Sequence, residues 1–168
     1  MVATKASNLE VMYSGVINND TSVTASDIAK YLLSMSEPGT PFAITPLKLQ
    51  KLLYYVQGWH MALENVNLFS DDFEAWDHGP VIRSIYEDYK HYGYRTIEKV
   101  NLKEIENQIL NDNQIRLINA VWNVYGEFDG KYLEQLTHQE EPWINTPRNS
   151  IIDKRNIGSY FVGMLNKG

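Results

Sequence analysis

The sequence of 168 residues contains no cysteine. Disulfide bonds, thiol nucleophiles and thiolate metal sites are therefore excluded. Apolar runs long enough to span a bilayer are also absent, and the first twenty residues lack the basic and then apolar pattern of a secretory signal. These absences predict a cytoplasmic protein without a membrane partner.

Basic residues are fewer than acidic ones: 15 Lys and Arg stand against 21 Asp and Glu, which gives a net charge of −6. Affinity for nucleic acid comes mainly from neutralising phosphates with Lys and Arg. The charge, together with the lack of a helix-turn-helix pattern, disfavours nucleic acid as a partner. It suits a basic protein partner instead.

Motifs for catalysis and metal binding are missing as well. The sequence has no glycine-rich phosphate loop, no Gly-x-Ser-x-Gly elbow and no two-histidine zinc motif. His138 and Glu141 have a spacing that is compatible with a metal on a helix, but Pro142 interrupts the helix there and no second histidine follows. We therefore predict no metal and no cofactor.

The most informative segment that is present covers residues 45–64. Thr45 can cap a helix, and Pro46 suits its first position, where the missing N–H costs nothing. Large apolar residues then recur at spacings of three and four on two faces, so this helix needs protein on both sides. The sequence predicts a mainly α domain built around this central buried helix.

Only Lys48, Lys51 and Glu64 of this helix are expected to face water. Ile85 and Tyr86, from a later helix, are expected to pack in the core against the apolar faces of this helix. The predicted core comprises Leu49, Leu52, Leu53, Val56, Trp59, Leu63, Ile85 and Tyr86.

The remaining pattern predicts further helices and one hairpin. Residues 1–23 are expected to form a loosely held arm, and residues 24–168 a single domain. A small β-hairpin is expected at about residues 67–77. Caps and apolar periods predict helices at 24–35, 80–93 and 113–126, from 129 to the break at Glu141-Pro142 and from 153, with weak helical character within 94–112.

Four pieces in this order carry a family resemblance. They are the run Thr45 to Trp59, Leu68-Phe69, the run Glu74 to Val81 with Ile85-Tyr86, and Leu136-Thr-His-Gln-Glu-Glu-Pro-Trp143. Together they resemble the SocA-like Panacea domain over about residues 26–160. The sequence departs from the family pattern at Val56 and at His78.

The resemblance implies an antitoxin of bacteria and their prophages, which binds and neutralises a protein toxin encoded nearby without catalysis. Some members of the family present a toxin to a protease instead. Because binding residues concentrate on loops, we expect the partner, or the support of the partner site, at two chain breaks that adjoin in a polar and aromatic pocket. The residues concerned are Glu74, Trp76, His78, Gly79, Pro80, Thr137, His138, Glu141, Pro142 and Trp143.

Two other functions stay open from the sequence alone. The first is an enzyme with a pocket around Glu74, His138 and Glu141, which would need carboxylate or imidazole groups with strongly shifted pKa values. The second is a prophage-encoded regulator, which would need a basic face for nucleic acid.

Overall fold

A computed structural model describes residues 23–105 and 109–167 of the chain. The expected N-terminal arm lies outside these residues except for Val23, and so does part of the weak helix expected within 94–112. Within 94–112, the described part contains a short 3-10 helix, η2, at Leu102–Glu104 and the first residue of the next helix, α5.

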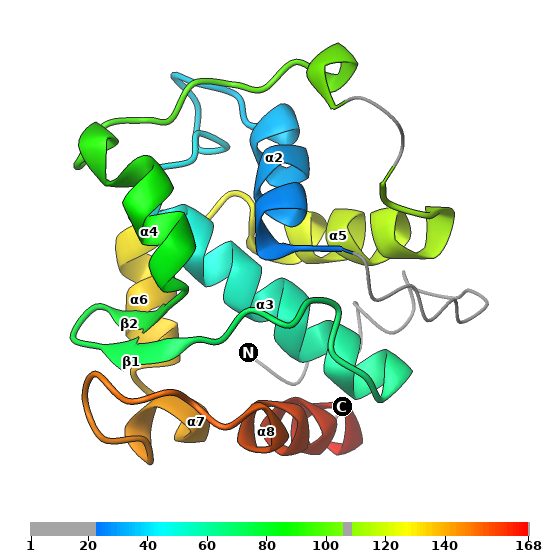
Figure 1. Cartoon of the computed structure of the whole chain (residues 1–168), viewed down its shortest axis with the longest axis vertical. Coiled ribbons are helices and arrows are strands. Elements are labelled where there is room, and N and C mark those ends of the chain that lie inside the picture. Colours follow the sequence, from blue (N-terminus) through cyan, green and yellow to red (C-terminus); the bar gives the residue numbers. More distant parts are fainter. Residues whose placement is uncertain (1–22, 106–108, 168) are drawn as a thin grey trace.

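Helix α3, Pro46–Glu64, is the centre of the molecule (Figure 1). The hydroxyl of Thr45 accepts a hydrogen bond from the backbone N–H of Lys48, and Pro46 lies in the first turn, as predicted. Helices α2 (Ala25–Met35) and α8 (Lys154–Asn166) pack on opposite sides of it, and α5 (Asp112–Tyr125) and α6 (Gly130–Thr137) also contact it. This arrangement confirms a mainly α fold around one central helix.

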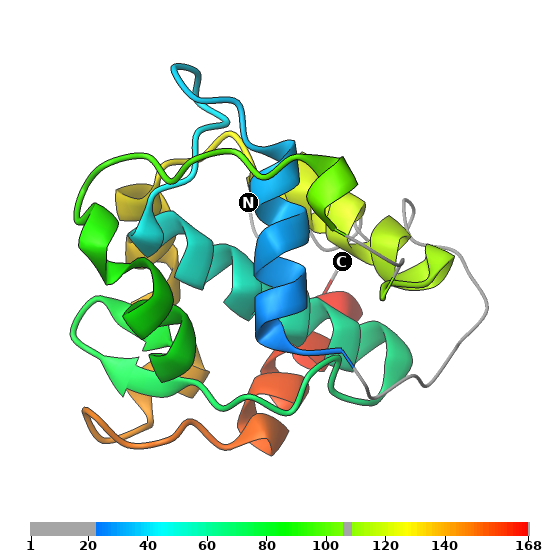
Figure 2. The ribbon, with the colours of Figure 1, turned by 45° about the horizontal axis from the view of Figure 1, so that its top comes forward.

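Side-chain caps determine where the surrounding helices begin. Helix α2, which crosses α3 in Figure 2, starts with a capping box of Thr24 and Asp27. A second capping box, of Asn111 and Gln114, starts α5, and single aspartates cap the other two helices. For these four helices the predicted starts are thus confirmed to within one residue.

The β-hairpin lies later in the chain than the predicted range of 67–77. Strand β1 (Glu74–Trp76) pairs antiparallel with β2 (Gly79–Val81), while residues 67–73 form no strand. Leu68 and Phe69 form no strand, and the side chain of Gln57 binds their backbone in place of a neighbouring strand.

Helix α4, Arg83–Tyr89, also begins later than predicted. Pro80 belongs to β2, where it pairs with Ala75, and a proline is tolerated in so short a strand. A 3-10 turn, η1 (Lys90–Tyr92), follows α4, and Gly93 ends it with a positive φ of 58°. The predicted stop at Gly93 is therefore confirmed.

Residues after α6 complete the surface beside the hairpin. Helix α6 ends at Thr137, before the predicted break at Glu141-Pro142, and Pro142 lies instead in the first turn of a short helix, α7 (Glu141–Ile144). The segment after α7 then runs along the free side of β1, where Ala75 donates to the carbonyl of Ser150 and Ile152 donates to that of Phe73.

Most of the apolar residues expected in the core are almost fully buried: Leu49, Leu52, Leu53, Val56, Trp59 and Ile85. Leu63 is half-buried and packs against this core. Tyr86 corrects the prediction, because 41% of it is exposed. Successive helical residues point about 100° apart, so the inward position of Ile85 turns Tyr86 to the surface, where its ring meets Trp76.

The polar residues of α3 correct a second prediction, since Lys48, Lys51 and Glu64 are all buried. The ammonium group of Lys48 donates to the carbonyl groups of Pro41 and Gly126, and that of Lys51 to the carbonyl of Pro80. A buried charge is tolerated only with such partners. None of the described helices is long and apolar enough to cross a membrane.

Candidate partner-binding site

The two chain breaks that the sequence singles out meet in space. The indole N–H of Trp143 donates to the backbone carbonyl of Trp76 at 2.8 Å. On the other side of the hairpin, His78 Nδ1 lies 3.0 Å from Glu134 Oε1. We call residues 74–80 together with residues 134–143 the hairpin–α7 corner. The expectation that these segments adjoin agrees with these contacts.

Lys51 of α3 supports this corner from below. Its ammonium group donates to the carbonyl of Pro80 at 3.0 Å, and burial lowers its pKa to about 7 against the opposing effect of Glu134. Gly79 lies directly above it with a φ of 100°. A Cβ atom at position 79 would lie 2.7 Å from Thr137 Oγ1 and 2.8 Å from Lys51 Cε, so the close packing of the turn requires glycine.

Glu134 is the charged centre of the corner. Its buried side chain contacts His78, Lys131 at 3.3 Å and His138 at 4.0 Å. Burial by itself raises the pKa of Glu134, but the hydrogen bonds with His78 and Lys131 outweigh it, so the pKa is lowered. The group is therefore a carboxylate at neutral pH, and it ties α6 to the turn of the hairpin.

Aromatic rings and arginines cover the outer side of the corner. Trp143 stacks on His138 with ring centroids 4.1 Å apart, and the guanidinium of Arg148 lies 3.6 Å from the centroid of Trp143. Trp76 meets Tyr86 edge to face at 4.9 Å, and Arg83 lies 5.3 Å from the same indole. Tryptophan, tyrosine and arginine are the residues that dominate binding energy in protein interfaces.

The predicted site residues divide into two groups by exposure. Gly79, Pro80, Thr137 and Pro142 are buried, so they can support a binding surface but cannot contact a partner directly. The others are half-buried or exposed, with the side chain of His78 73% exposed. This second group consists of Glu74, Trp76, His78, His138, Glu141 and Trp143.

Several buried polar atoms in and beside the corner have no hydrogen bond. In the part of the chain that the structure describes, these include Glu74 Oε2, Trp76 Nε1, His138 Nε2 and Arg148 Nη1. Buried polar atoms are nearly always satisfied in folded proteins, so a concentration of four at one place calls for an explanation. A partner would provide one if these side chains turn outward on binding to meet its donors and acceptors.

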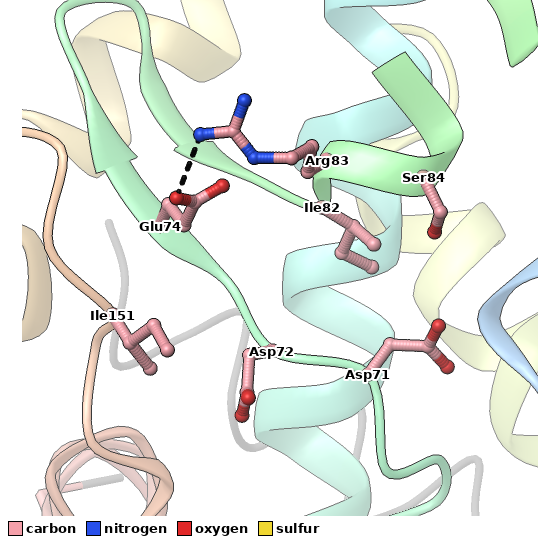
Figure 3. Close-up of a pocket in the computed structure, with 7 residues that line it drawn as sticks. All are labelled: Asp71, Asp72, Glu74, Ile82, Arg83, Ser84 and Ile151. Carbon is pink, nitrogen blue, oxygen red and sulfur yellow. Dashed lines mark hydrogen bonds and ion pairs between the residues drawn. The ribbon is translucent and has the colours of Figure 1, made fainter. Parts of the chain in front are cut away.

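An open hollow of about 320 Å³ adjoins the corner on the outer side of β1 (Figure 3). Its lining contains the ion pair of Glu74 Oε1 with Arg83 Nη2, which are 3.0 Å apart. Asp72, which is paired with Lys154, and the 58% exposed Ile151 also line it. Asp71, Ile82 and Ser84 complete the lining.

The residues of the enzyme alternative do not share one site. Glu74 lines the hollow beside β1, whereas Glu141 lines a second hollow of about 220 Å³ between α7 and α8. His138 lines neither of these two hollows and stacks on Trp143 instead. Within residues 23–105 and 109–167, no cluster of three or more His, Asp or Glu side chains is arranged to hold a metal ion.

Sequence reasoning missed the buried polar residues of α3 that hold the neighbouring loops. Gln50 exchanges two hydrogen bonds with the backbone of Ile82, at 2.9 and 3.1 Å. The side chain of Gln57 likewise accepts from the backbone N–H of Leu68 at 2.8 Å and donates to the backbone carbonyl of Phe69 at 2.7 Å. The available signal was that these glutamines, with Lys51, interrupt a helix that is otherwise apolar on two faces.

The fold and the corner define a small mainly α domain that presents an aromatic and charged surface on a hairpin. Comparison with protein families is specific: residues 49–144 match the family described as antitoxin SocA-like, Panacea domain. The match covers more than half of the chain, and the chain belongs to this family. No curated protein and no solved structure matches the chain.

Proposed function

We propose that the protein is a cytoplasmic antitoxin that binds a protein toxin encoded nearby and neutralises it by direct contact, without catalysis. Membership of the SocA-like antitoxin family supports the role. The hairpin–α7 corner is the proposed contact surface. The observation that carries this choice is the group of four buried polar atoms without hydrogen bonds in and beside the corner.

The composition of the corner also supports a protein partner. The rings of Trp76, Tyr86 and Trp143 lie at the surface beside Arg83 and Arg148. Tryptophan and tyrosine rings lose little entropy on binding. Together with arginine they anchor interfaces when a partner covers them. The net charge of −6 favours association with a basic toxin through electrostatic attraction.

The test is co-expression with the toxin gene that lies beside this gene, read out as growth. Glu74→Gln removes a charge with little change in volume, and His138→Ala removes the ring beneath Trp143. Breaking a buried and paired interaction with the toxin at either residue costs about 2–5 kcal/mol of binding free energy. Both variants should be folded and should fail to protect, while Lys103→Ala, on the exposed η2 turn, should protect fully.

Normal protection by both folded variants would place the contact surface elsewhere. The amount of toxin in the same cells separates two ways of neutralisation. Direct blocking leaves the toxin abundance unchanged, whereas delivery to a protease lowers it.

A further inference from the structure

Glu140 is a buried carboxyl group placed directly before α7. It is 5% exposed and occupies the N-cap position of this helix, although its side chain does not cap it. The carboxyl oxygens instead accept from the hydroxyl of Tyr55 on α3, at 3.1 and 3.2 Å. Tyr160 on α8 also hydrogen-bonds to it. One carboxyl group thus joins the start of α7 to two other helices.

The groups that face this carboxyl from each packed helix are phenols. They are Tyr54 and Tyr55 from α3, Tyr125 from α5 and Tyr160 from α8, while Glu141 of α7 is exposed to solvent. Among the described residues, none of the groups bonded to Glu140 is a cation. Burial therefore raises the pKa of Glu140 to about 8, against the hydrogen bonds of Tyr55 and Tyr160, which favour the ionised form.

The phenol that holds Glu140 is itself held rigidly by the core. Tyr55 stacks on Tyr125 with centroids 4.1 Å apart and planes 12° apart. The hydroxyl of Tyr125 accepts from the indole of the fully buried Trp59 at 3.0 Å. A row of packed rings therefore connects the centre of α3 to the carboxyl group that precedes α7.

Trp143 is the third residue of α7, and its position depends on where this helix begins. The helix is only four residues long, and the carbonyl of Glu140 accepts the backbone N–H of Ile144. So short a helix has little stability of its own and takes its position from tertiary contacts. The contact of Trp143 with Trp76 is the bond that joins α7 to the hairpin.

We propose that Glu140 is a positioning residue of the corner: its neutral carboxyl group, held by Tyr55 and Tyr160, fixes the start of α7 and thereby holds Trp143 against the hairpin. The importance of this position for toxin binding rests on the proposed function. The contacts of Glu140 within the free protein do not depend on that proposal. Ionisation would leave a negative charge among phenols without a compensating cation, so α7 and Trp143 shift when Glu140 loses its proton.

The test uses the full chain labelled with 5-fluorotryptophan, whose four tryptophans give four fluorine NMR signals. Replacement of each tryptophan by phenylalanine assigns them. Because the ring of His138 stacks on Trp143, and because Lys51 contacts the corner and has a pKa of about 7, the series is measured in a His138→Asn, Lys51→Met background. We expect the Trp143 signal to shift between pH 6 and 9.5 with a midpoint near 8, the pKa of Glu140.

Glu140→Gln keeps the size of the side chain but cannot ionise, so the Trp143 signal should stay at its low-pH position throughout. The same change at the exposed Glu127 is the matched control and should leave the titration intact. Tyr160→Phe removes one hydrogen bond that favours the ionised carboxyl, so the midpoint should move to higher pH.

A Trp143 signal that does not titrate, or one that still titrates in Glu140→Gln, would overturn the proposal. If Glu140→Gln does not fold, an unchanged midpoint in Tyr160→Phe overturns it equally. These measurements need no toxin. Failure of the antitoxin proposal in the growth assay is therefore distinguishable from failure of this one.

Discussion

Helix α3 and the hairpin–α7 corner use their polar side chains in opposite ways. In α3, Gln50, Lys51 and Gln57 are buried, and each binds backbone groups of the segment between α3 and α4. In the corner, Glu74 and His138 reach the surface and each keeps one buried atom without a hydrogen bond.

This difference separates residues that hold the fold from residues available to a partner, although both regions carry the pattern that resembles the family. Satisfied polar groups in the interior specify where the hairpin lies, because leaving any of them unpaired costs about 1–3 kcal/mol. Buried groups near the surface that lack a hydrogen bond gain free energy when their side chains turn outward to meet a donor or acceptor of a partner. Three substitutions and a chelation experiment test this contrast, from the largest expected effect to the smallest.

Trp59→Ala should destabilise the domain by about 3–5 kcal/mol, the usual cost of deleting a large buried aromatic. Trp59 is fully buried in α3 and donates to the hydroxyl of Tyr125. Equilibrium denaturation measures the loss. Tyr94→Ala, which removes an aromatic ring that is 102% exposed, should change the stability by less than about 0.5 kcal/mol. A loss below about 1 kcal/mol for Trp59→Ala would contradict a central buried helix.

Lys51→Met should change how stability depends on pH. Burial lowers the pKa of Lys51 from 10.5 to about 7 in the folded protein. Between these values the unfolded chain binds a proton that the folded protein does not, so this lysine makes the wild type more stable as the pH rises. Methionine has no such group, and its stability relative to the wild type should therefore fall with rising pH, by at most about 1.4 kcal/mol per pH unit.

Denaturation at pH 7, 8 and 9 measures this difference. Lys103→Met is the matched control, because Lys103 is exposed and its curve should run parallel to that of the wild type. Parallel curves for Lys51→Met would show that Lys51 has the same charge in both states and that its ammonium group is not buried as described.

Tyr86→Ala should separate binding from stability. Tyr86 is 41% exposed and contacts Trp76 of the corner, so its loss should cost little stability, about 1 kcal/mol or less. Under the proposed function it should weaken toxin binding by about 1–2 kcal/mol, as removal of an interface tyrosine does. Titration calorimetry with the purified toxin measures this, with Tyr94→Ala as the matched tyrosine outside the corner. Equal affinities of the two variants would remove Tyr86 from the interface.

Chelation should have no effect. The described residues contain no cluster suited to a metal ion, and the whole sequence has no cysteine. We expect the same Tm with and without EDTA, measured by thermal unfolding, and the same protection from the toxin. A drop of several degrees that zinc reverses would show a structural metal.

The helices that begin with a cap were predictable, because a cap and a 3.6-residue period are local features of the chain. Thr45 with Pro46, Thr24 with Asp27, and Asp129 start helices where the sequence indicates. The hairpin was misplaced because the apolar residues Leu68 and Phe69 look like a strand. Their backbone is held instead by the side chain of Gln57, eleven and twelve residues away, and no local pattern contains this information.

The sequence by itself determined the central helix, the helical class and the two segments that form the corner. Only the tertiary structure decided the roles of the polar residues, because the cost of a charge depends on what surrounds it. Lys51 has the sequence appearance of a solvated lysine, yet it lies beneath Gly79 and Pro80. In the sequence, Glu140 resembles a surface carboxylate just before a helix that has a proline in its first turn. In the structure, phenols from two other helices enclose it. Contacts between residues that lie 85 or more positions apart in the sequence, such as that of Tyr55 with Glu140, exist only once the chain has folded.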